Sequence, residues 1–288
     1  MMNRNAVFLT VVTLLAICVL GCKDKPAESE EQEPTADTLS VDTTVRDTVT
    51  MDAMDSLIAA TPMPKAADGL FDDFLFNFTA NKTLQYERIQ FPLKVLCDNE
   101  ESHIQQKDWQ MEKFFMKQGY CTLIFDNEEQ MEVMKDTTVG KVIVEKIHLD
   151  NKQVEQFYFE RDSGQWMLTE IHRDAIYQNS NESFLSFYQH FANDSVFQVE
   201  SLDEPVSTTM PDPDDDFTMI DGEFYPEQWG DFKPPILPTG VIYNVIYGQK
   251  YEESTQKVFV IRGISNGLET EMTFKCKDGK WKLIKIVN

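Results

Sequence analysis

The segment GQWMLTEI at residues 164–171 returns as GKWKLIKI at residues 279–286, and this pair of segments decides the fold. Gly, Trp, Leu and Ile hold the same places in both segments. A polar turn precedes each segment, and β-branched and aromatic residues follow the turn, as is typical of a strand. The pair therefore predicts that the chain contains two copies of one structural unit, each of which ends in a β-strand.

Two further segments of the same character precede each of these strands. The predicted strands cover 142–149, 153–160 and 165–171 in the first copy, and 257–264, 268–275 and 280–286 in the second. Asn266-Gly267 and Asp278-Gly279 are dipeptides favoured in two-residue hairpin turns, because both central positions require a positive φ. Each set of three segments therefore predicts an antiparallel meander.

The repeat extends toward the N-terminus, where Phe74, Phe78 and Pro92 recur as Phe187, Phe191 and Pro205. Trp109 and Trp229 are a further pair, whose larger offset implies insertions between the copies. Apolar residues at the spacing of one helix face open each copy, at Leu70, Phe71, Phe74, Leu75 and Phe78, and at Phe184, Phe187, Tyr188 and Phe191. Each copy is therefore predicted to begin with a helix.

A short amphipathic helix, an irregular stretch and a meander that ends in Gly-x-Trp-x-Leu-x-x-Ile resemble the nuclear-transport-factor-2-like, or cystatin-like, cone fold. In that fold a curved sheet wraps the N-terminal helix and leaves a pocket. The segment 84–93 is also similar to a motif of a family of lipoproteins of unknown function that often carry this fold twice. Leu84 departs from the motif, and the matching residues are Gln85, Glu87, Ile89, Phe91, Pro92 and Leu93. The resemblance covers about residues 69–288 and implies no catalytic residue.

We therefore predict an α+β fold of two tandem cone-like domains, each an N-terminal helix packed on a curved antiparallel sheet. The predicted organisation is a lipoprotein signal peptide at 1–21, a disordered acidic tether at 22–68, a first cone-fold repeat at 69–177 and a second at 178–288.

The N-terminus has the order of a secretory signal: Arg4, an uncharged apolar run to Leu20, then Gly21 and Cys22. The run is shorter than the about 20 apolar residues that a membrane-spanning helix needs. Val19-Leu20-Gly21-Cys22 resembles the bacterial lipobox, which implies cleavage before Cys22, acylation of its thiol and a membrane anchor. We expect the chain in the cell envelope outside the cytoplasm, at the outer membrane. The alternative is an ordinary cleaved signal followed by a free cysteine.

The segment 23–70 contains no Phe, Tyr or Trp, and such a composition cannot offset the entropy lost on folding. Four triplets within it, each an Asp, a hydroxyl residue and then an apolar residue or Thr, resemble an O-glycosylation sequon of one group of Gram-negative bacteria. The candidate acceptors are Thr38, Thr43, Thr48 and Ser56. A tract rich in Asp, Thr and Val also produces such triplets by chance.

The formal net charge is −23, from 26 Lys and Arg against 49 Asp and Glu. Such a field repels phosphate backbones, so nucleic acid is excluded as a partner. Cys97, Cys121 and Cys276 remain beyond the lipobox. They are interpreted as buried small apolar residues, and a bridge between Cys97 and Cys121 stays open.

The acidic loop after residue 211 is a candidate calcium site. Asp212, Asp214, Asp216 and Glu223 hold the positions that supply carboxylate ligands in an EF-hand. Phe217 replaces the required Gly, so the favoured alternative is a solvated acidic loop without a bound cofactor. A second candidate is a row of His148, Glu155 and His172 across the first meander, for which an ordinary sheet edge is the favoured alternative.

Tyr225, Trp229 and Phe232 lie in a proline-rich loop and are candidate ligand-binding residues. Exposed aromatic side chains stack on sugars and peptides, so a glycan or peptide ligand would suit them. The alternative is that these rings close the open mouth of the cone.

No nucleophile motif, phosphate loop, cysteine metal motif or dinucleotide fingerprint is present. We expect a non-enzymatic binding or accessory lipoprotein that uses a cone pocket or the groove between the repeats. The alternatives are a hydrolase or isomerase, with Tyr120, His148 or Asp126 as acid or base, and a structural docking module of an envelope complex. An apolar pocket with one buried carboxylate of raised pKa would favour the enzyme.

Overall fold

The computed structural model describes residues 62–288, apart from residues 99, 213, 252–253 and 265. The predicted signal peptide, the predicted lipidation site Cys22 and the candidate glycosylation sites Thr38, Thr43, Thr48 and Ser56 lie outside the described residues. No helix within the described residues is long and apolar enough to cross a membrane.

The first half of the described chain contains two α-helices followed by six strands. Phe71, Phe74, Leu75 and Phe78 form the buried face of the first helix, as predicted. Asn81 lies between the two helices. Its side chain accepts a hydrogen bond from the Leu84 N–H group and so caps the N-terminus of the second helix. The elements are α2 (Phe71–Ala80), α3 (Lys82–Glu87), β1 (Ile89–Cys97), β2 (Glu100–Ile104), β3 (Tyr120–Phe125), β4 (Lys141–His148), β5 (Gln153–Asp162) and β6 (Gln165–Ala175).

The second half repeats this order, with one additional short helix. Asp194 takes the place of Asn81 and accepts hydrogen bonds from the N–H groups of Val196 and Phe197. The elements are α4 (Glu182–Asn193), α5 (Ser195–Glu200), β7 (Leu202–Asp212), β8 (Asp215–Phe224), α6 (Trp229–Phe232), β9 (Val241–Ile246), β10 (Gln256–Gly263), β11 (Glu269–Lys277) and β12 (Lys280–Val287). Short 3-10 helices precede or connect these elements, namely η1 (Lys65–Asp68), η2 (Gln106–Asp108), η3 (Phe114–Lys117), η4 (Glu128–Lys135), η5 (Ile176–Gln178) and η6 (Pro226–Gln228).

The six predicted meander strands are confirmed as β4, β5 and β6 and as β10, β11 and β12. The two-residue turn at Asp278-Gly279 is also confirmed, since Lys277 pairs with Lys280 and both turn residues have a positive φ. The two-residue turn at Asn266-Gly267 is wrong. The last pair there is Arg262 with Glu269, so a longer loop joins β10 to β11.

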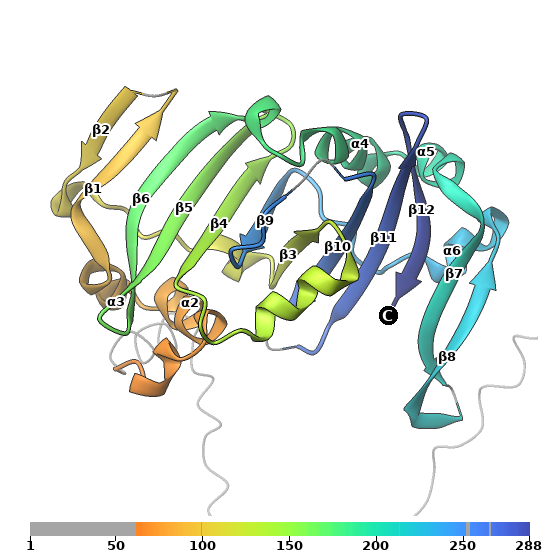
Figure 1. Ribbon diagram of the computed structural model, residues 1–288, viewed down its shortest axis with the longest axis horizontal. Coiled ribbons are helices and arrows are strands. Elements are labelled where there is room, and N and C mark those ends of the chain that lie inside the picture. Colours follow the sequence, from red (N-terminus) through yellow and green to blue (C-terminus); the bar gives the residue numbers. More distant parts are fainter. Residues whose placement is uncertain (1–61, 99, 213, 252–253, 265) are drawn as a thin grey trace, which may run out of the picture. The chain divides into compact units, whose positions relative to one another are not determined.

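All twelve strands belong to one sheet, in the order β2-β1-β6-β5-β4-β9-β3-β10-β11-β12-β7-β8 (Figure 1). The expectation of two separate antiparallel sheets is therefore wrong. The strands β3 and β9 are exchanged between the halves: β9 pairs with β4, and β3 pairs with β10. The pairs β1–β6, β12–β7 and β3–β9 are parallel. The predicted boundary between residues 177 and 178 falls within η5, and the described residues from 62 to 288 belong to one compact unit.

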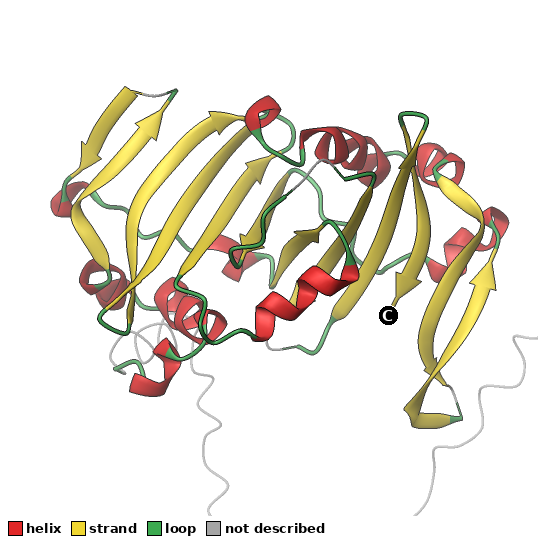
Figure 2. Ribbon diagram, in the orientation of Figure 1, coloured by secondary structure: helices red, strands yellow, loops and turns green. Residues whose placement is uncertain are grey.

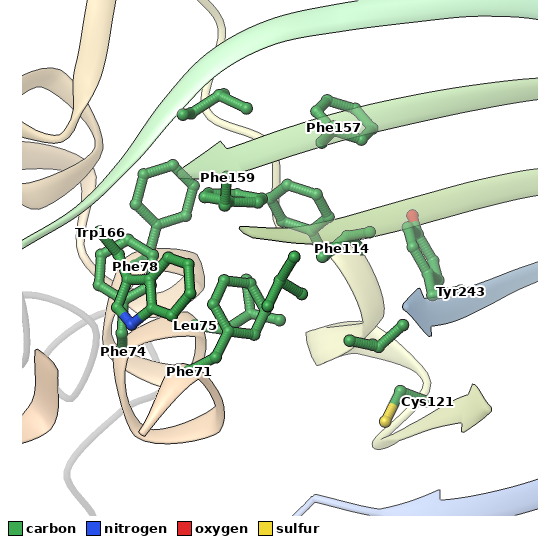
Figure 3. Close-up of a cluster of buried hydrophobic side chains, with 14 of the residues drawn as sticks. Phe71, Phe74, Leu75, Phe78, Phe114, Cys121, Phe157, Phe159, Trp166 and Tyr243 are labelled. Carbon is green, nitrogen blue, oxygen red and sulfur yellow. The ribbon is translucent and has the colours of Figure 1, made fainter. Parts of the chain in front are cut away.

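Two apolar cores lie on opposite faces of this sheet. The first core gathers around α2, and Figure 3 shows the rings of Phe71, Phe74, Phe78, Phe159 and Trp166 within it. The second core gathers around α4 and contains Phe184, Tyr188, Phe191, Phe274 and Trp281. Successive residues of a strand point to opposite faces.

The exchanged strand β3 shows this alternation directly. Leu123 and Phe125 belong to the first core, whereas Ile124 belongs to the second. The central strands are therefore buried on both faces, and Figure 2 shows short helices distributed along the whole sheet. The sheet positions α2 against strands of both halves of the chain.

Candidate functional site

A pocket with a volume of about 500 Å³ lies beside α2. Residues of the segment before α2, such as Ala66 and Ala67, and the α2 residues Leu75 and Phe76 form one wall. The opposite wall comes from β3, β9 and β10 and includes Cys121, Val245 and Arg262. Cys121 and Arg262 are neighbours because β3 pairs with β10 in the exchanged arrangement. The pocket is thus built from both halves of the chain.

The polar groups of the pocket gather around Asp72 in the first turn of α2. The Tyr247 hydroxyl donates a hydrogen bond to Asp72 Oδ1. Arg262 Nη1 lies 3.8 Å from Asp72 Oδ2, and Arg262 Nε donates to Glu269 Oε2 at 2.8 Å. Asp73 and Asn77 complete the polar part of the lining. The remaining lining is mostly apolar, which is the usual composition of a small-molecule site.

Burial perturbs the ionisable groups of the pocket. Loss of solvation in the pocket wall raises the pKa of Asp72, and the hydrogen bond from Tyr247 and the charge of Arg262 oppose this effect. Half of the Asp72 side chain remains accessible, at 51% of its surface. Burial and the neighbouring carboxylate of Asp72 raise the pKa of Tyr247 well above its usual value. The Tyr247 phenol therefore stays protonated and acts as a hydrogen-bond donor.

Cys121 is a free thiol in the pocket lining. Burial raises its pKa to about 12. The reactive form of a cysteine is the thiolate, which such a pKa suppresses at neutral pH. Cys97 is also free, so the two do not form a disulfide, and Cys276 is the third free cysteine of the described residues. Burial of Cys121 agrees with its interpretation as a small apolar residue, whereas Cys97 is exposed and departs from it.

A fully buried carboxylate, Glu145, lies on β4 away from the pocket. Oε1 accepts hydrogen bonds from Gln156 Nε2 at 2.9 Å and from Asn179 Nδ2 at 2.8 Å. Oε2 accepts one from Asn244 Nδ2 at 2.7 Å. Burial raises the pKa of Glu145, and these three hydrogen bonds oppose the shift. Glu145 thus connects β4, β5, the exchanged strand β9 and the segment between the halves.

The candidate calcium residues lie on a β-hairpin and do not converge. Asp212 pairs with Asp215 at the turn, whereas Glu223 pairs with Ser207 far along β8. Glu223 lies eight positions after Asp215, which corresponds to about 26 Å along a strand. Asp214 donates its backbone N–H to Asp212 Oδ1, and Asp216 continues β8. The described residues contain no group of three or more acidic, histidine or cysteine side chains that could hold a metal.

The histidine row is wrong because of its register. His148 pairs with Gln153, not with Glu155, since the turn between β4 and β5 is longer than predicted. Glu155 pairs with Arg173, because an irregularity between Tyr158 and Phe159 shifts β6 by one residue. A one-residue shift moves a side chain to the other face, so the three side chains do not line up.

The aromatic loop is divided between buried and exposed rings. Trp229 is buried and donates its Nε1–H to Gln198 Oε1 at 3.0 Å. Phe232 stacks on Phe224 at a centroid distance of 4.4 Å. Tyr225 alone is exposed, over 53% of its surface. Two of the three rings therefore close the second core, as in the alternative interpretation of this loop.

The candidate acids and bases Tyr120, His148 and Asp126 do not line the pocket. Tyr120 packs against the second core, and His148 ends β4. Asp126 forms a buried ion pair with Lys257. The structure does not bring these three residues together. The sequence missed Asp72, Tyr247 and Arg262, because only the pairing of β3 with β10 places residues so distant in the chain around one pocket.

Residues 50–288 match the family model described as a domain of unknown function, DUF4348. This match extends over more than half of the chain. The chain belongs to the DUF4348 family. No curated protein shows a significant match to it.

A crystal structure of an NTF2-like protein from Bacteroides fragilis NCTC 9343 is similar to this DUF4348 chain over most of its length. The two are 39% identical, the similarity covers 78% of this chain and 98% of the other, and the TM-score is 0.74. The predicted nuclear-transport-factor-2-like character and the membership of an unknown-function family are therefore confirmed for the DUF4348 chain, as is the mixed helix and sheet content.

Proposed function

We propose that this chain is a lipid-anchored envelope protein that binds a small, largely apolar molecule in the pocket beside α2. The observation that carries the proposal is the pocket itself. Its volume of about 500 Å³ lies within the range of small-molecule sites, and a few polar groups converge on one part of an apolar lining.

The state of the polar groups favours binding over catalysis. Tyr247 is a protonated donor, and the Cys121 thiol is protonated at neutral pH. Arg262 is already hydrogen-bonded to Glu269. An acid–base enzyme generally needs an acid and a base poised to exchange protons with the substrate, and Tyr247, Cys121 and Arg262 are not poised in this way.

The anchor is part of the proposal and rests on the sequence. An apolar run followed directly by Val19-Leu20-Gly21-Cys22 supports cleavage and acylation at Cys22, and several acyl chains hold a protein firmly at a membrane. Mass spectrometry of the full chain purified from membranes should show an acylated Cys22 as the first residue. A mature chain that begins elsewhere without lipid would reject the anchor.

Binding can be tested on the same material. The full chain is extracted with organic solvent, and the extract is analysed for a molecule that co-purifies in stoichiometric amount. Leu75, which is buried and lines the pocket, is replaced by Trp to fill the pocket, and Leu75→Met serves as the volume-matched control. We expect the molecule with the wild type and Leu75→Met and not with Leu75→Trp. Equal extracts from all three, together with no binding of the neutral dye N-phenyl-1-naphthylamine, would contradict the proposal.

Asp72 supports a second candidate function, that of a hydrolase or isomerase in which its carboxylate takes a proton from the substrate. The supporting observation is a carboxylate of raised pKa in an apolar pocket. If this candidate is right, the co-purifying molecule is converted on prolonged incubation with the wild type, and Asp72→Asn abolishes the conversion. A molecule recovered unchanged would reject the enzyme and leave the binding function standing.

A further inference from the structure

Asp72 and Arg262 face the pocket as an ion pair that is not closed by a hydrogen bond. The 3.8 Å between Arg262 Nη1 and Asp72 Oδ2 is too long for one. The two side chains remain accessible, Asp72 over 51% and Arg262 over 25% of the surface. A strong acceptor and a strong donor thus lie side by side in a mostly apolar lining.

Each of the two groups already makes one hydrogen bond. Tyr247 occupies Asp72 Oδ1, and Glu269 occupies Arg262 Nε. Neither Asp72 Oδ2 nor the Arg262 Nη groups have a hydrogen-bond partner among the described residues. A guanidinium or carboxylate that loses water on ligand binding must regain hydrogen bonds, or the binding free energy suffers. The head group of a suitable ligand therefore has to accept from Arg262 and donate to Asp72 together.

Neither an anionic nor a cationic head group can satisfy both members of the pair. A carboxylate placed against Arg262 would lie close to the carboxylates of Asp72 and Asp73, both in the lining. An ammonium placed against Asp72 would lie close to the Arg262 guanidinium and would leave the Arg262 Nη groups without an acceptor. A neutral group with an adjacent carbonyl and N–H avoids both repulsions.

We propose that the pocket selects a neutral ligand with an apolar body and a carboxamide-type head, whose carbonyl oxygen accepts from Arg262 and whose N–H donates to Asp72. The proposal rests on the proposed binding function and names its ligand class. Primary amides, peptide bonds and acetamido groups share this head-group chemistry.

The test uses three probes with one body and different heads: 4-phenylbutanamide, 4-phenylbutanoate and 4-phenylbutylammonium. Binding to the full chain in lipid nanodiscs is measured by isothermal titration calorimetry, with empty nanodiscs as the blank. We expect the amide to bind about tenfold more tightly than either charged probe.

Three variants distinguish the roles of the pair. Asp72→Asn keeps an oxygen for Tyr247 and presents an amide N–H where Oδ2 stood, so amide binding should fall about tenfold and carboxylate binding should rise. Arg262→Met removes the donor, so amide binding should fall and ammonium binding should rise. Arg173→Met removes the same charge from an exposed position on β6 outside the pocket lining, and should leave all three affinities unchanged.

The outcomes separate the ligand class from the function. A preference for the amide that Asp72→Asn inverts supports the proposal. Equal affinities for the three heads, or a preference for an ionic head, would overturn the ligand class while binding in the pocket stands. If neither the probes nor the neutral dye binds, the proposed binding function and the proposed ligand class are both wrong.

Discussion

The regions covered by α2 and α4 occupy equivalent places in the two halves, yet one is open and the other is filled. Beside α2, Leu75 and Asp72 border the pocket. Their equivalents on α4 are Tyr188 and Leu185, both fully buried. The Tyr188 ring lies 4.4 Å from the Phe259 ring, so the larger side chain occupies the space next to its helix.

The opposite wall shows the same difference. Val142 pairs with Phe159 in the first half and Lys257 pairs with Phe274 in the second, which makes Ile147 the equivalent of Arg262. The polar pair of Asp72 and Arg262 is therefore replaced by the apolar pair of Leu185 and Ile147, and both of these are buried. Charged groups occur where a pocket gives them access to solvent, since burial without a partner is costly. One architecture thus leaves an open pocket in one place and a packed core in the other.

The largest effect is expected from Tyr188→Ala, which removes the ring that fills the second region. Loss of a large buried ring should lower the free energy of unfolding by about 3–5 kcal/mol, measured by urea denaturation. Tyr188→Phe is the matched control. The Tyr188 hydroxyl has no hydrogen-bond partner among the described residues, so its removal should change the stability by less than about 1 kcal/mol. Similar losses for both variants would show that the ring does not fill the core.

Substitution of the equivalent residues Gln85 and Gln198 should lower the free energy of unfolding by different amounts. Both are buried, but Gln85 makes four hydrogen bonds, with Phe78 O, Trp109 Nε1 and both backbone groups of Glu112. The side chain of Gln198 makes one hydrogen bond among the described residues, which its Oε1 accepts from Trp229 Nε1. Gln85→Leu should lower the free energy of unfolding by about 3 kcal/mol, and Gln198→Leu by about 1 kcal/mol, because each orphaned buried group carries its own penalty. Equal losses in urea denaturation would argue against this difference.

Glu145 gives the second region a pH dependence. The pKa of Glu145 is raised in the folded protein, so the protonated carboxyl stabilises the folded state. That stabilisation is lost as the pH rises through the raised pKa. Glu145→Gln should therefore gain stability relative to the wild type as the pH rises, by about 1.4 kcal/mol for each unit of the pKa shift. Urea denaturation from pH 4 to 8 measures the gap. Glu160→Gln, on the exposed side of β5, is the control. If the stability of Glu145→Gln relative to the wild type fell with rising pH, the prediction would be wrong.

The smallest effect is expected at the exposed ring of the aromatic loop. Tyr225→Ala should change the free energy of unfolding by less than about 0.5 kcal/mol, because more than half of the ring is in solvent. Phe232→Ala, which removes the ring stacked on Phe224, should cost about 2 kcal/mol and serves as the comparison. A large loss from Tyr225→Ala in thermal denaturation would assign that ring to the core.

Prediction from the sequence succeeded where the signal was local. The helical spacing of Phe71, Phe74 and Phe78 and the tight turn at Asp278-Gly279 each depend on a few neighbouring residues. It failed for β3 and β9, which are short and carry no turn motif, and consequently for the single sheet. It also failed for the histidine row, because one irregularity near Tyr158 changes the register of β6.

The candidate site could not be predicted for the same reason. Asp72, Tyr247 and Arg262 belong to no motif, and their separation in the chain hides their proximity. The only signal available was the resemblance to a fold with a pocket beside its first helix, which indicated the region and not its residues.

The sequence by itself determined the repeated order of helix and meander, the strong negative charge and the residues that form each helix face. These follow from composition, periodicity and turn chemistry, which act over short distances along the chain. Only the tertiary structure decided that the halves share one sheet, that the exchange of β3 and β9 brings Cys121 beside Arg262, and that Tyr188 fills one region while the other stays open. Strand exchange and side-chain packing depend on contacts between distant segments, and local patterns do not encode which segments meet.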